Sequence, residues 1–346
     1  MGLQHVETGA PAAFAAAAAE PLLAIRGLTV TAEGAAQPLI EDLSLTINRG
    51  EVVALVGESG SGKSMTALSL VRLLPRGVSI TAGEMRLEGR DIAALPESAL
   101  DGLRGGEVAM LFQQPHAMLD PTCQIREQIA EPLRWHRGLS RKRAFGRVVE
   151  LMTRVGIPDP AARSRAYAHE LSGGMAQRMM IATAMGPAPK LLIADEPTTA
   201  LDVTVQAQIL ALMDKERRDN DLSILLITHD LSVVSAFADR VAVMYSGRIV
   251  EEGPTAQVMA DPQHPYTRAL IRCSLLEPEA DGRLLAIPGS LVRTRELATG
   301  CRFAPRCAMA AEPSLHGHCA GTEPALSPVG ADRAARCHAV RPLSAS

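Results

Sequence analysis

The stretch "VGESGSGKSM", residues 56–65, decides the fold of this chain. It matches the pattern G-x-x-x-x-G-K-[ST] through Gly57, Gly62, Lys63 and Ser64. The apolar run "EVVALVG" leads into it as an expected strand, and "SMTALSLVRLL" follows with helical spacing and stops before a proline. Because a strand, a glycine-rich turn and a helix are the context that this pattern requires, the sequence predicts a phosphate-binding loop.

The residue types of this loop suit a nucleoside triphosphate better than an ordinary glycine- and serine-rich turn. Glycines let backbone N–H groups turn inward around an anion, and the N-terminus of the helix adds partial positive charge. Lys63 is one of only four lysines in the chain, and its compact ammonium group reaches phosphate oxygens where a planar guanidinium is too wide. The Ser64 hydroxyl is a candidate ligand of Mg²⁺. The residues expected to contact the nucleotide are Gly57, Glu58, Ser59, Gly60, Ser61, Gly62, Lys63, Ser64 and Met65.

The composition of the chain argues against several kinds of partner. Its 346 residues carry a net charge of −3, so nothing suggests a nucleic-acid partner. Aromatic residues make up only 3%, which argues against platforms for stacking bases. No segment approaches the roughly 18 uninterrupted apolar residues of a membrane span, so we expect any membrane role to depend on a partner.

Alternating strand and helix patterns predict an α/β fold. Short runs rich in Val, Ile and Leu predict strands within residues 22–57, and residues 124–168 alternate apolar and charged positions at helical period. From "KLLIADEP" to "RIVEEG" strands and helices alternate again, and several strands are apolar throughout, as in a sheet buried on both faces. The expected parts are a disordered leader at 1–20, a nucleotide-binding domain at 21–275 with a helical subdomain at about 120–188, and a Cys-rich extension at 276–346.

Polar side chains at the ends of three apolar runs are candidates for the chemistry. "LLIADEP" ends with Asp195 and Glu196, and the carboxyl ends of strands in an α/β sheet are where ligands bind. Adjacent residues on a strand point to opposite sides, so we assign Asp195 to Mg²⁺ and Glu196 to the general base. His229 ends "LITHD" and is expected to bond the γ-phosphate. Gln113 of "LFQQP" is expected to reach the metal or the water, with Gln114 as its competitor.

A second anion site is expected at the start of another helix. "HELSGGMAQRMMIATAM" places Ser172, Gly173 and Gly174 at a helix N-terminus. An N-cap role explains Ser172 by itself, but the paired glycines allow a close approach of the backbone to a ligand.

Together these motifs resemble the ATP-binding subunit of an ABC transporter, from about residue 22 to 340. The matching segments are the P-loop at 57–64, the Q-loop residue Gln113, the signature "LSGGM" at 171–175, the Walker B strand at 191–196, the D-loop "ALD" at 200–202 with Asp202, and the switch histidine His229. The resemblance implies a P-loop NTPase fold with a mixed sheet and a helical subdomain, and hydrolysis of ATP with Mg²⁺. Such subunits work as head-to-tail pairs in which each ATP lies between the P-loop of one and the signature of the other. The family often stacks adenine on an aromatic residue where this chain has Ala32.

The C-terminal half carries a narrower resemblance. "DPQHPYTRAL" (261–270), "IPG" (287–289) and "GCRFAPRC" (300–307) look like the branch that imports di- and oligopeptides, which also includes nickel and opine importers. Within that branch the chain resembles the "D-type" ATPase. The implied partners are a second, different ATPase subunit, two integral membrane permease subunits and an extracytoplasmic substrate-binding protein. The implied location is the cytoplasmic face of the bacterial inner membrane.

Two alternatives to a peptide-import ATPase stay open. "SGGMAQRMMIA" is similar to nickel-importer ATPases, so nickel, metal-chelate or opine import competes with peptide import. Nickel-importer ATPases generally lack the cysteine tail, which favours peptides. A soluble ABC ATPase of translation or DNA repair is the remoter alternative, because those proteins carry two nucleotide domains or a long coiled-coil insertion. This chain has one set of motifs and no sustained heptads.

Four of the six cysteines lie near the C-terminus, with the spacing C-x5-C-x11-C-x17-C: Cys301, Cys307, Cys319 and Cys337. By number they suit a [4Fe–4S] cluster or a tetrahedral zinc site equally, and the family resemblance implies the cluster. Unligated thiols in a loosely folded tail are the plainer alternative. Histidines that could substitute as ligands are His316, His318 and His338. We expect Cys123 and Cys273 to be small buried side chains.

Overall fold

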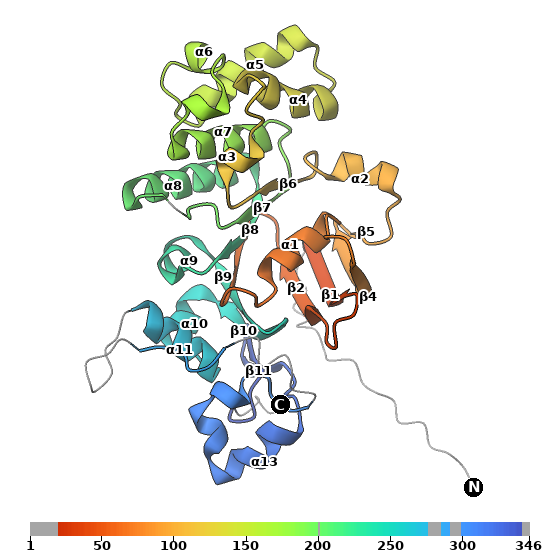
Figure 1. Cartoon of the computed structure of the whole chain (residues 1–346), viewed down its shortest axis with the longest axis vertical. Coiled ribbons are helices and arrows are strands. Elements are labelled where there is room, and N and C mark those ends of the chain that lie inside the picture. The colour runs from red at the N-terminus through yellow and green to blue at the C-terminus, as the bar shows by residue number, and fades with distance from the viewer. Residues whose placement is uncertain (1–19, 200, 276–284, 291–298, 341–346) are drawn as a thin grey trace.

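The computed structural model describes residues 20–199, 201–275, 285–290 and 299–340, and contains two sheets with helices packed around them (Figure 1). The expected leader lies almost wholly outside the described residues, as does Ala200 of the "ALD" motif. None of the described helices is both long and apolar enough to span a membrane.

The smaller sheet is antiparallel and has the strand order β2-β1-β4-β5. Its strands are β1 Leu23–Ala32, β2 Ile40–Ile47, β4 Val78–Leu87 and β5 Arg90–Asp91. Buried and exposed residues alternate along β2, which is the pattern of a strand with one face on the core. The register pairs Leu23 with Ile47 and with Leu87 across the two flanking strands.

The larger sheet has the order β11-β12-β10-β9-β3-β8-β7-β6. Its parallel strands are β3 Val52–Val56, β6 Val108–Leu111, β7 Leu191–Asp195, β8 Ser223–Thr228 and β9 Arg240–Tyr245. Antiparallel strands continue it: β10 Arg248–Pro254, β12 Arg333–Ala335 and β11 Ser327–Gly330. The sheet is therefore mixed, as the family resemblance implied, and tail residues form the two outermost strands at one of its edges.

Strand β3 separates two hydrophobic cores. Val52, Ala54 and Val56 belong to one core, and Val53 and Leu55 belong to the other. Successive side chains of a strand point to opposite faces, so a fully apolar strand is required where both faces are covered. This position places the end of β3, and the loop that follows it, in the middle of the sheet.

Helices cover both cores. Their bounds are α1 Lys63–Leu70, α2 Glu97–Leu103, α3 Pro115–Met118, α4 Ile125–Arg137, α5 Arg141–Arg154, α6 Pro160–Arg163, α7 Gly173–Met185, α8 Val203–Asn220, α9 Leu231–Phe237, α10 Thr255–Ala260, α11 Pro265–Ser274 and α13 Pro313–Gly321. Helices α3 to α7 gather at one end of the molecule, and α13 lies at the opposite end (Figure 1). Buried residues recur at helical spacing, as in Ile125, Ile129 and Leu133 of α4, which explains why this polar-looking region folds as amphipathic helices.

Two local expectations are wrong. The first helix ends at Leu70 instead of continuing to Leu74, because Arg72 adopts a left-handed backbone with φ of 51° that breaks the helical ladder. Cys123 and Cys273 are half-buried instead of buried, since Cys123 lies in the connection before α4 and Cys273 lies in the last turn of α11.

Candidate nucleotide-binding site

The phosphate loop runs from the end of β3 to the start of α1, and two of its glycines are required by close packing. A Cβ atom on Gly57 would lie 2.2 Å from the carbonyl oxygen of Met244, and one on Gly62 would lie 2.5 Å from the Cε atom of Met244. Both glycines also have positive φ, 153° and 116°. The Gly247 N–H donates to the carbonyl oxygen of Ser61 at 2.8 Å. The turn after β9 therefore shapes this loop.

Donors gather where the loop enters α1. The Thr66 N–H donates to the Gly62 carbonyl at 2.9 Å, so the N–H groups that precede it at the helix start have no intrahelical acceptor. The hydroxyl of Ser61 is buried and has no hydrogen-bond partner among the described residues. This arrangement of donors fits an anion such as a phosphate group.

Lys63 lies under the loop with a buried ammonium group. Its Nζ atom donates to the carbonyl oxygens of Gly57 at 2.7 Å and Glu58 at 3.1 Å. Burial lowers the pKa of Lys63, and the neighbouring carboxylates of Glu196 and Asp195 oppose that effect. A phosphate would be a stronger acceptor for this ammonium group than the two carbonyls.

Asp195 ends β7 beside the start of α1. The Ser64 hydroxyl donates a hydrogen bond to its carboxylate, so two of the residues expected at Mg²⁺ lie in contact. Burial raises the pKa of Asp195, and the bond from Ser64 opposes the rise. A hydroxyl and one carboxylate suit Mg²⁺, which takes its remaining ligands from water and from substrate phosphates. When bound, Mg²⁺ would supply positive charge against phosphate oxygens.

Glu196 departs from the expected geometry. We expected it to continue the strand, but β7 ends at Asp195 and Glu196 adopts a left-handed backbone with φ of 48°. Its N–H donates to the carbonyl oxygen of Ile227, the neighbouring β8 residue, at 2.8 Å. The turn at this residue, more than strand alternation, separates its carboxylate from that of Asp195.

The carboxylate of Glu196 is the meeting point of the candidate catalytic residues. Its Oε2 atom accepts from Nε2 of Gln113 at 3.0 Å and from Oγ1 of Thr199 at 2.7 Å. Its Oε1 atom lies 3.0 Å from Nδ1 of His229. Burial acts to raise the pKa of Glu196, but the bonds to Thr199 and His229 outweigh it and the pKa is lowered. Gln114 instead precedes α3 as its N-cap residue.

Thr199 was missed by the sequence reasoning. It lies three residues after Glu196 in "EPTT", and only the turn that follows β7 brings its hydroxyl to the carboxylate. Because Glu196 is held by side chains from the segments that follow β6, β7 and β8, it has a defined orientation and remains ionised near neutral pH.

The second expected anion site lies elsewhere in the chain. Ser172 caps α7, and its Oγ atom accepts from the Met175 N–H at 3.4 Å. Asp202 caps α8 through the Val205 N–H at 2.9 Å, and a Cβ atom on Gly174 would lie 2.9 Å from Cγ1 of Val205. Figure 1 shows α7 among the upper helices, well separated from α1. One chain therefore does not bring its own "LSGGM" segment to its phosphate loop.

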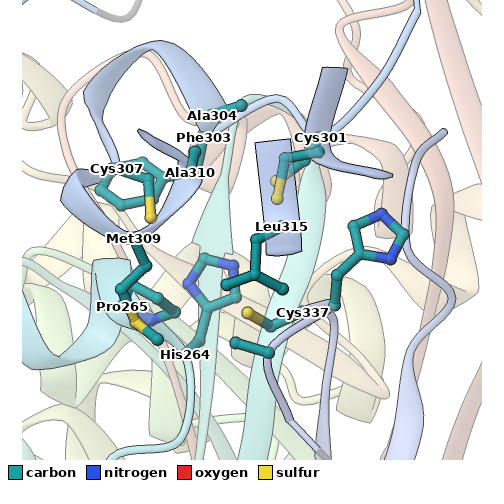
Figure 2. Close-up of a pocket in the computed structure, with 13 residues that line it drawn as sticks. His264, Pro265, Cys301, Phe303, Ala304, Cys307, Met309, Ala310, Leu315 and Cys337 are labelled. Atoms are coloured by element: carbon teal, nitrogen blue, oxygen red, sulfur yellow. The ribbon is translucent and has the colours of Figure 1, made fainter. Parts of the chain in front are cut away.

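The four tail cysteines converge on one cavity although they are widely spaced in the sequence. Cys301, Cys307, Cys319 and Cys337 all line a cavity of about 20 Å³. Figure 2 shows three of them, Cys301, Cys307 and Cys337, around this space with Leu315 between them. Burial raises the pKa of the Cys301 thiol to about 12 and also raises those of Cys319 and Cys337.

The tail thiols are not paired with one another, and two of the three candidate histidines have a hydrogen-bond partner on one ring nitrogen. The four cysteines are unbridged. Within the described parts of the chain, no three His, Cys, Asp or Glu side chains are grouped closely enough to hold a single metal ion. His316 Nδ1 lies 3.2 Å from the Ala310 carbonyl oxygen, and His338 Nε2 lies 2.8 Å from that of Thr322.

A glycine-rich loop between a central parallel strand and a helix, with carboxylates at the end of a nearby strand, defines a P-loop nucleoside triphosphatase. Comparison with known proteins narrows this class. Residues 40–199 match the family model described as ABC transporter, and residues 250–313 match the one described as oligopeptide/dipeptide transporter, C-terminal region.

Similar proteins and solved structures point to the same family as these models. A putative peptide import ATP-binding protein of Brucella ovis is 47% identical over 332 residues, which is 92% of this chain and 97% of the relative. One of Brucella melitensis is 46% identical over 320 residues, covering 92% and 94%. The ATP-binding cassette MJ0796, solved as a dimer bound to ADP and Pi, has a TM-score of 0.61 at 26% identity and covers 67% of this chain and 98% of its own. CbiO1 of Clostridium perfringens has a TM-score of 0.62 at 25% identity, covering 70% and 92%. This chain belongs to the ATP-binding proteins of ABC transporters, and it is an ATPase of that type.

Proposed function

We propose that this ATPase energises the import of di- or oligopeptides through an ABC transporter. The observation that carries the proposal is the pairing, in one chain, of the ABC nucleotide site with the oligopeptide/dipeptide C-terminal region at 250–313. The relatives named as peptide import proteins cover nearly the whole chain at 46–47% identity, which supports the same cargo class.

Each candidate site residue has a proposed role that follows from its position. Lys63 and the donors at the start of α1 bind the phosphates, and Ser64 and Asp195 hold Mg²⁺. Glu196 accepts the proton of the attacking water as general base. His229 contacts Glu196 through Nδ1, which leaves Nε2 able to reach the γ-phosphate. Gln113 orients the carboxylate and the water.

The separation of α7 from α1 supports a paired architecture. We propose that a second ATPase subunit supplies its signature residues to this P-loop, while Ser172, Gly173 and Gly174 face the partner's nucleotide, with Asp202 beside them. We further propose that this chain acts on two permease subunits from the cytoplasmic face, with a substrate-binding protein on the other side; the relatives named as peptide import ATP-binding proteins support this. The partner ATPase is proposed to be a different protein.

Co-purification with the permease subunits, followed by ATPase assay with the substrate-binding protein, tests this proposal. Stimulation of ATP turnover by peptides supports it. Stimulation by nickel or a metal chelate, with none by peptides, would refute the cargo assignment but keep the transporter. Co-purification with ribosomes or DNA in place of permeases would refute the transporter role.

The tail cysteines support a second, separate proposal, that they hold a [4Fe–4S] cluster. Four unbridged thiols on one cavity supply the ligand number of such a cluster, whose four cysteine sulfur atoms lie farther apart than the ligands of a single ion. A bound cluster would tie the tail together and could exchange one electron.

Anaerobically purified protein should be brown and contain about four irons per chain. Cys307→Ser should remove the colour while Cys123→Ser, outside the cavity, retains it. A colourless protein that contains zinc, or no metal, would refute the cluster.

A further inference from the structure

Glu58, which follows Gly57 in the phosphate loop, is held by groups from three parts of the chain. Its N–H donates to Oη of Tyr266 at 2.9 Å. Its carbonyl oxygen accepts from Nζ of Lys63 at 3.1 Å. Its carboxylate forms a two-point ion pair with Arg306, with Nη1 to Oε2 at 2.8 Å and Nη2 to Oε1 at 3.0 Å. The protein itself therefore fixes both the backbone and the side chain of this loop residue.

Arg306 uses its whole guanidinium group in this position. Its side chain is only 5% exposed. Besides the Glu58 carboxylate, it donates through Nε to the carbonyl oxygen of Pro288 at 2.6 Å and through Nη1 to Oη of Tyr245 at 3.3 Å. The planar fork of arginine is needed for such a set of bonds, and lysine cannot reproduce it. An ion pair whose arginine is buried and whose carboxylate is half-buried is well oriented and only partly screened by solvent.

The segment that contains Arg306, residues 301–307, also supplies an aromatic ring that packs against Tyr266. Phe303 packs against Tyr245 and Tyr266 with ring centroids 5.2 Å and 5.4 Å apart, and Tyr245 and Tyr266 are 4.6 Å apart. Tyr266 is fully buried, so its hydroxyl has little freedom to leave the Glu58 N–H. Residues 301–307 thus contact the phosphate loop, while Cys301 and Cys307 at their ends line the cysteine cavity.

From these contacts we infer that Arg306 is a positioning residue of the nucleotide site, acting through Glu58. With Tyr266, it holds the first turn of the phosphate loop in the conformation that receives the triphosphate. The C-terminal tail is then part of the ATP-binding apparatus of this chain. The inference rests on the proposed role of residues 57–65 in binding ATP.

The expected effect is on affinity more than on the chemical step. A loop that is already ordered binds without the free-energy cost of ordering it, so loss of the clamp weakens binding. Glu196, Gln113 and His229 have no contact with Arg306 among the described hydrogen bonds, so the turnover of bound ATP should change little. We expect Arg306→Ala to raise the KM for ATP about tenfold and to change kcat less than twofold.

A double-mutant cycle tests whether the effect passes through Glu58. Arg306→Ala, Glu58→Ala and the double variant are compared for KM and kcat in the assembled transporter, and for Mg·ATP affinity of the full chain by calorimetry. If Arg306 acts through Glu58, the effect of Arg306→Ala disappears once Glu58 is already alanine, so the double variant binds Mg·ATP no more weakly than Glu58→Ala does. Multiplication of the two single effects would overturn the inference. Should Arg306→Ala not fold, Arg306→Lys keeps the charge, loses the fork and is expected to raise KM about fivefold, and an unchanged KM would overturn the inference.

The matched control is Arg333→Gln, which loosens the tail at another place. Arg333 of β12 is 9% exposed and donates through Nη2 to Oε1 of Glu251 at 3.2 Å, and none of its described hydrogen bonds goes to residues 57–65. It should lower the melting temperature and leave KM unchanged. An equal rise of KM in this control would refute a specific role for Arg306. Absence of Mg·ATP binding by the wild-type chain would instead refute the proposed function of the loop.

Discussion

Replacing Glu196 by glutamine tests the catalytic assignment with the smallest change of shape. The amide is isosteric with the carboxylate but cannot accept the proton of a water molecule. General-base catalysis contributes about 10²- to 10⁴-fold, so we expect kcat to fall about a thousandfold, equivalent to about 4 kcal/mol of transition-state stabilisation. The lowered pKa of Glu196 makes the wild-type base fully ionised at neutral pH, so its rate should have no acid limb from this group between pH 6 and 8.

Nucleotide binding should survive the same substitution. The donors proposed to hold the phosphates are Lys63 and the start of α1, and neither needs the charge of Glu196. Removal of a negative charge near the phosphates should leave the affinity equal or higher. The amide oxygen can still accept from Gln113 or Thr199, so we expect the free energy of unfolding to change by about 1 kcal/mol at most.

The assay is ATP turnover by the complex with permease subunits, alongside Mg·ATP binding to the full chain. Thr199→Val is the matched control, because it removes one hydrogen bond to the same carboxylate but keeps the base. It should reduce kcat less than tenfold. Turnover by Glu196→Gln within tenfold of the wild type, with binding intact, would refute Glu196 as the base.

Three further predictions concern binding, packing and pH. Lys63→Ala should weaken Mg·ATP binding at least about a hundredfold by calorimetry, while the exposed Lys142→Ala should not; equal affinities would refute the loop assignment. Gly57→Ala should cost about 3 kcal/mol or more of unfolding free energy, because its Cβ would meet the Met244 carbonyl oxygen. Gly34→Ala, with positive φ but open space, should cost only about 1 kcal/mol, and equal losses in denaturant titrations would disprove the clash. Burial lowers the pKa of His264 to about 3, so its stabilising contribution is complete above its unfolded pKa of about 6.5 and is lost as the pH falls. Between pH 7 and 5 the wild type should lose about 2 kcal/mol more stability than His264→Asn, which keeps an acceptor for the Tyr266 N–H; parallel pH curves would contradict this.

The sequence was sufficient to predict those elements whose structure depends on neighbouring residues or on a repeated spacing of apolar residues. β3, the glycine-rich loop and α1 are consecutive, and apolar runs marked β7 and β8. The sequence placed Gln113, Glu196 and His229 at the ends of apolar runs, and their contacts agree with the rule that the carboxyl ends of adjacent parallel strands lie at one edge of a sheet. The prediction that Glu196 continues the alternation of β7 was wrong. A single residue with left-handed backbone ends the strand there, and the pattern of side chains does not reveal such a residue.

Contacts between residues far apart in the chain were not predictable from the pattern of residue types along the sequence. Met244 lies against Gly57 and Gly62 because β9 pairs with β3, and the glycines alone do not reveal which residue excludes a side chain. The tail strands β11 and β12 are short and lack alternation, so nothing in the sequence indicated that they extend the larger sheet beyond β10. A pair such as Glu58 and Arg306 leaves no periodic signal between its members.

The charge of Glu58 explains why such a distant partner matters. A carboxylate in the first turn of a phosphate loop repels the triphosphate that the loop receives, and it also contributes to the field on the Lys63 ammonium. Arg306 neutralises that carboxylate at hydrogen-bond distance, so the loop presents its amides and Lys63 without a net opposing charge. Removing Arg306 therefore both loosens the loop and uncovers a repulsive charge, and the two effects act in the same direction. Glu58→Gln separates them, because it removes the repulsion but keeps an acceptor for Arg306: affinity should then equal or exceed that of the wild type, whereas a loss as large as that of Arg306→Ala would mean that the ion pair itself orders the loop.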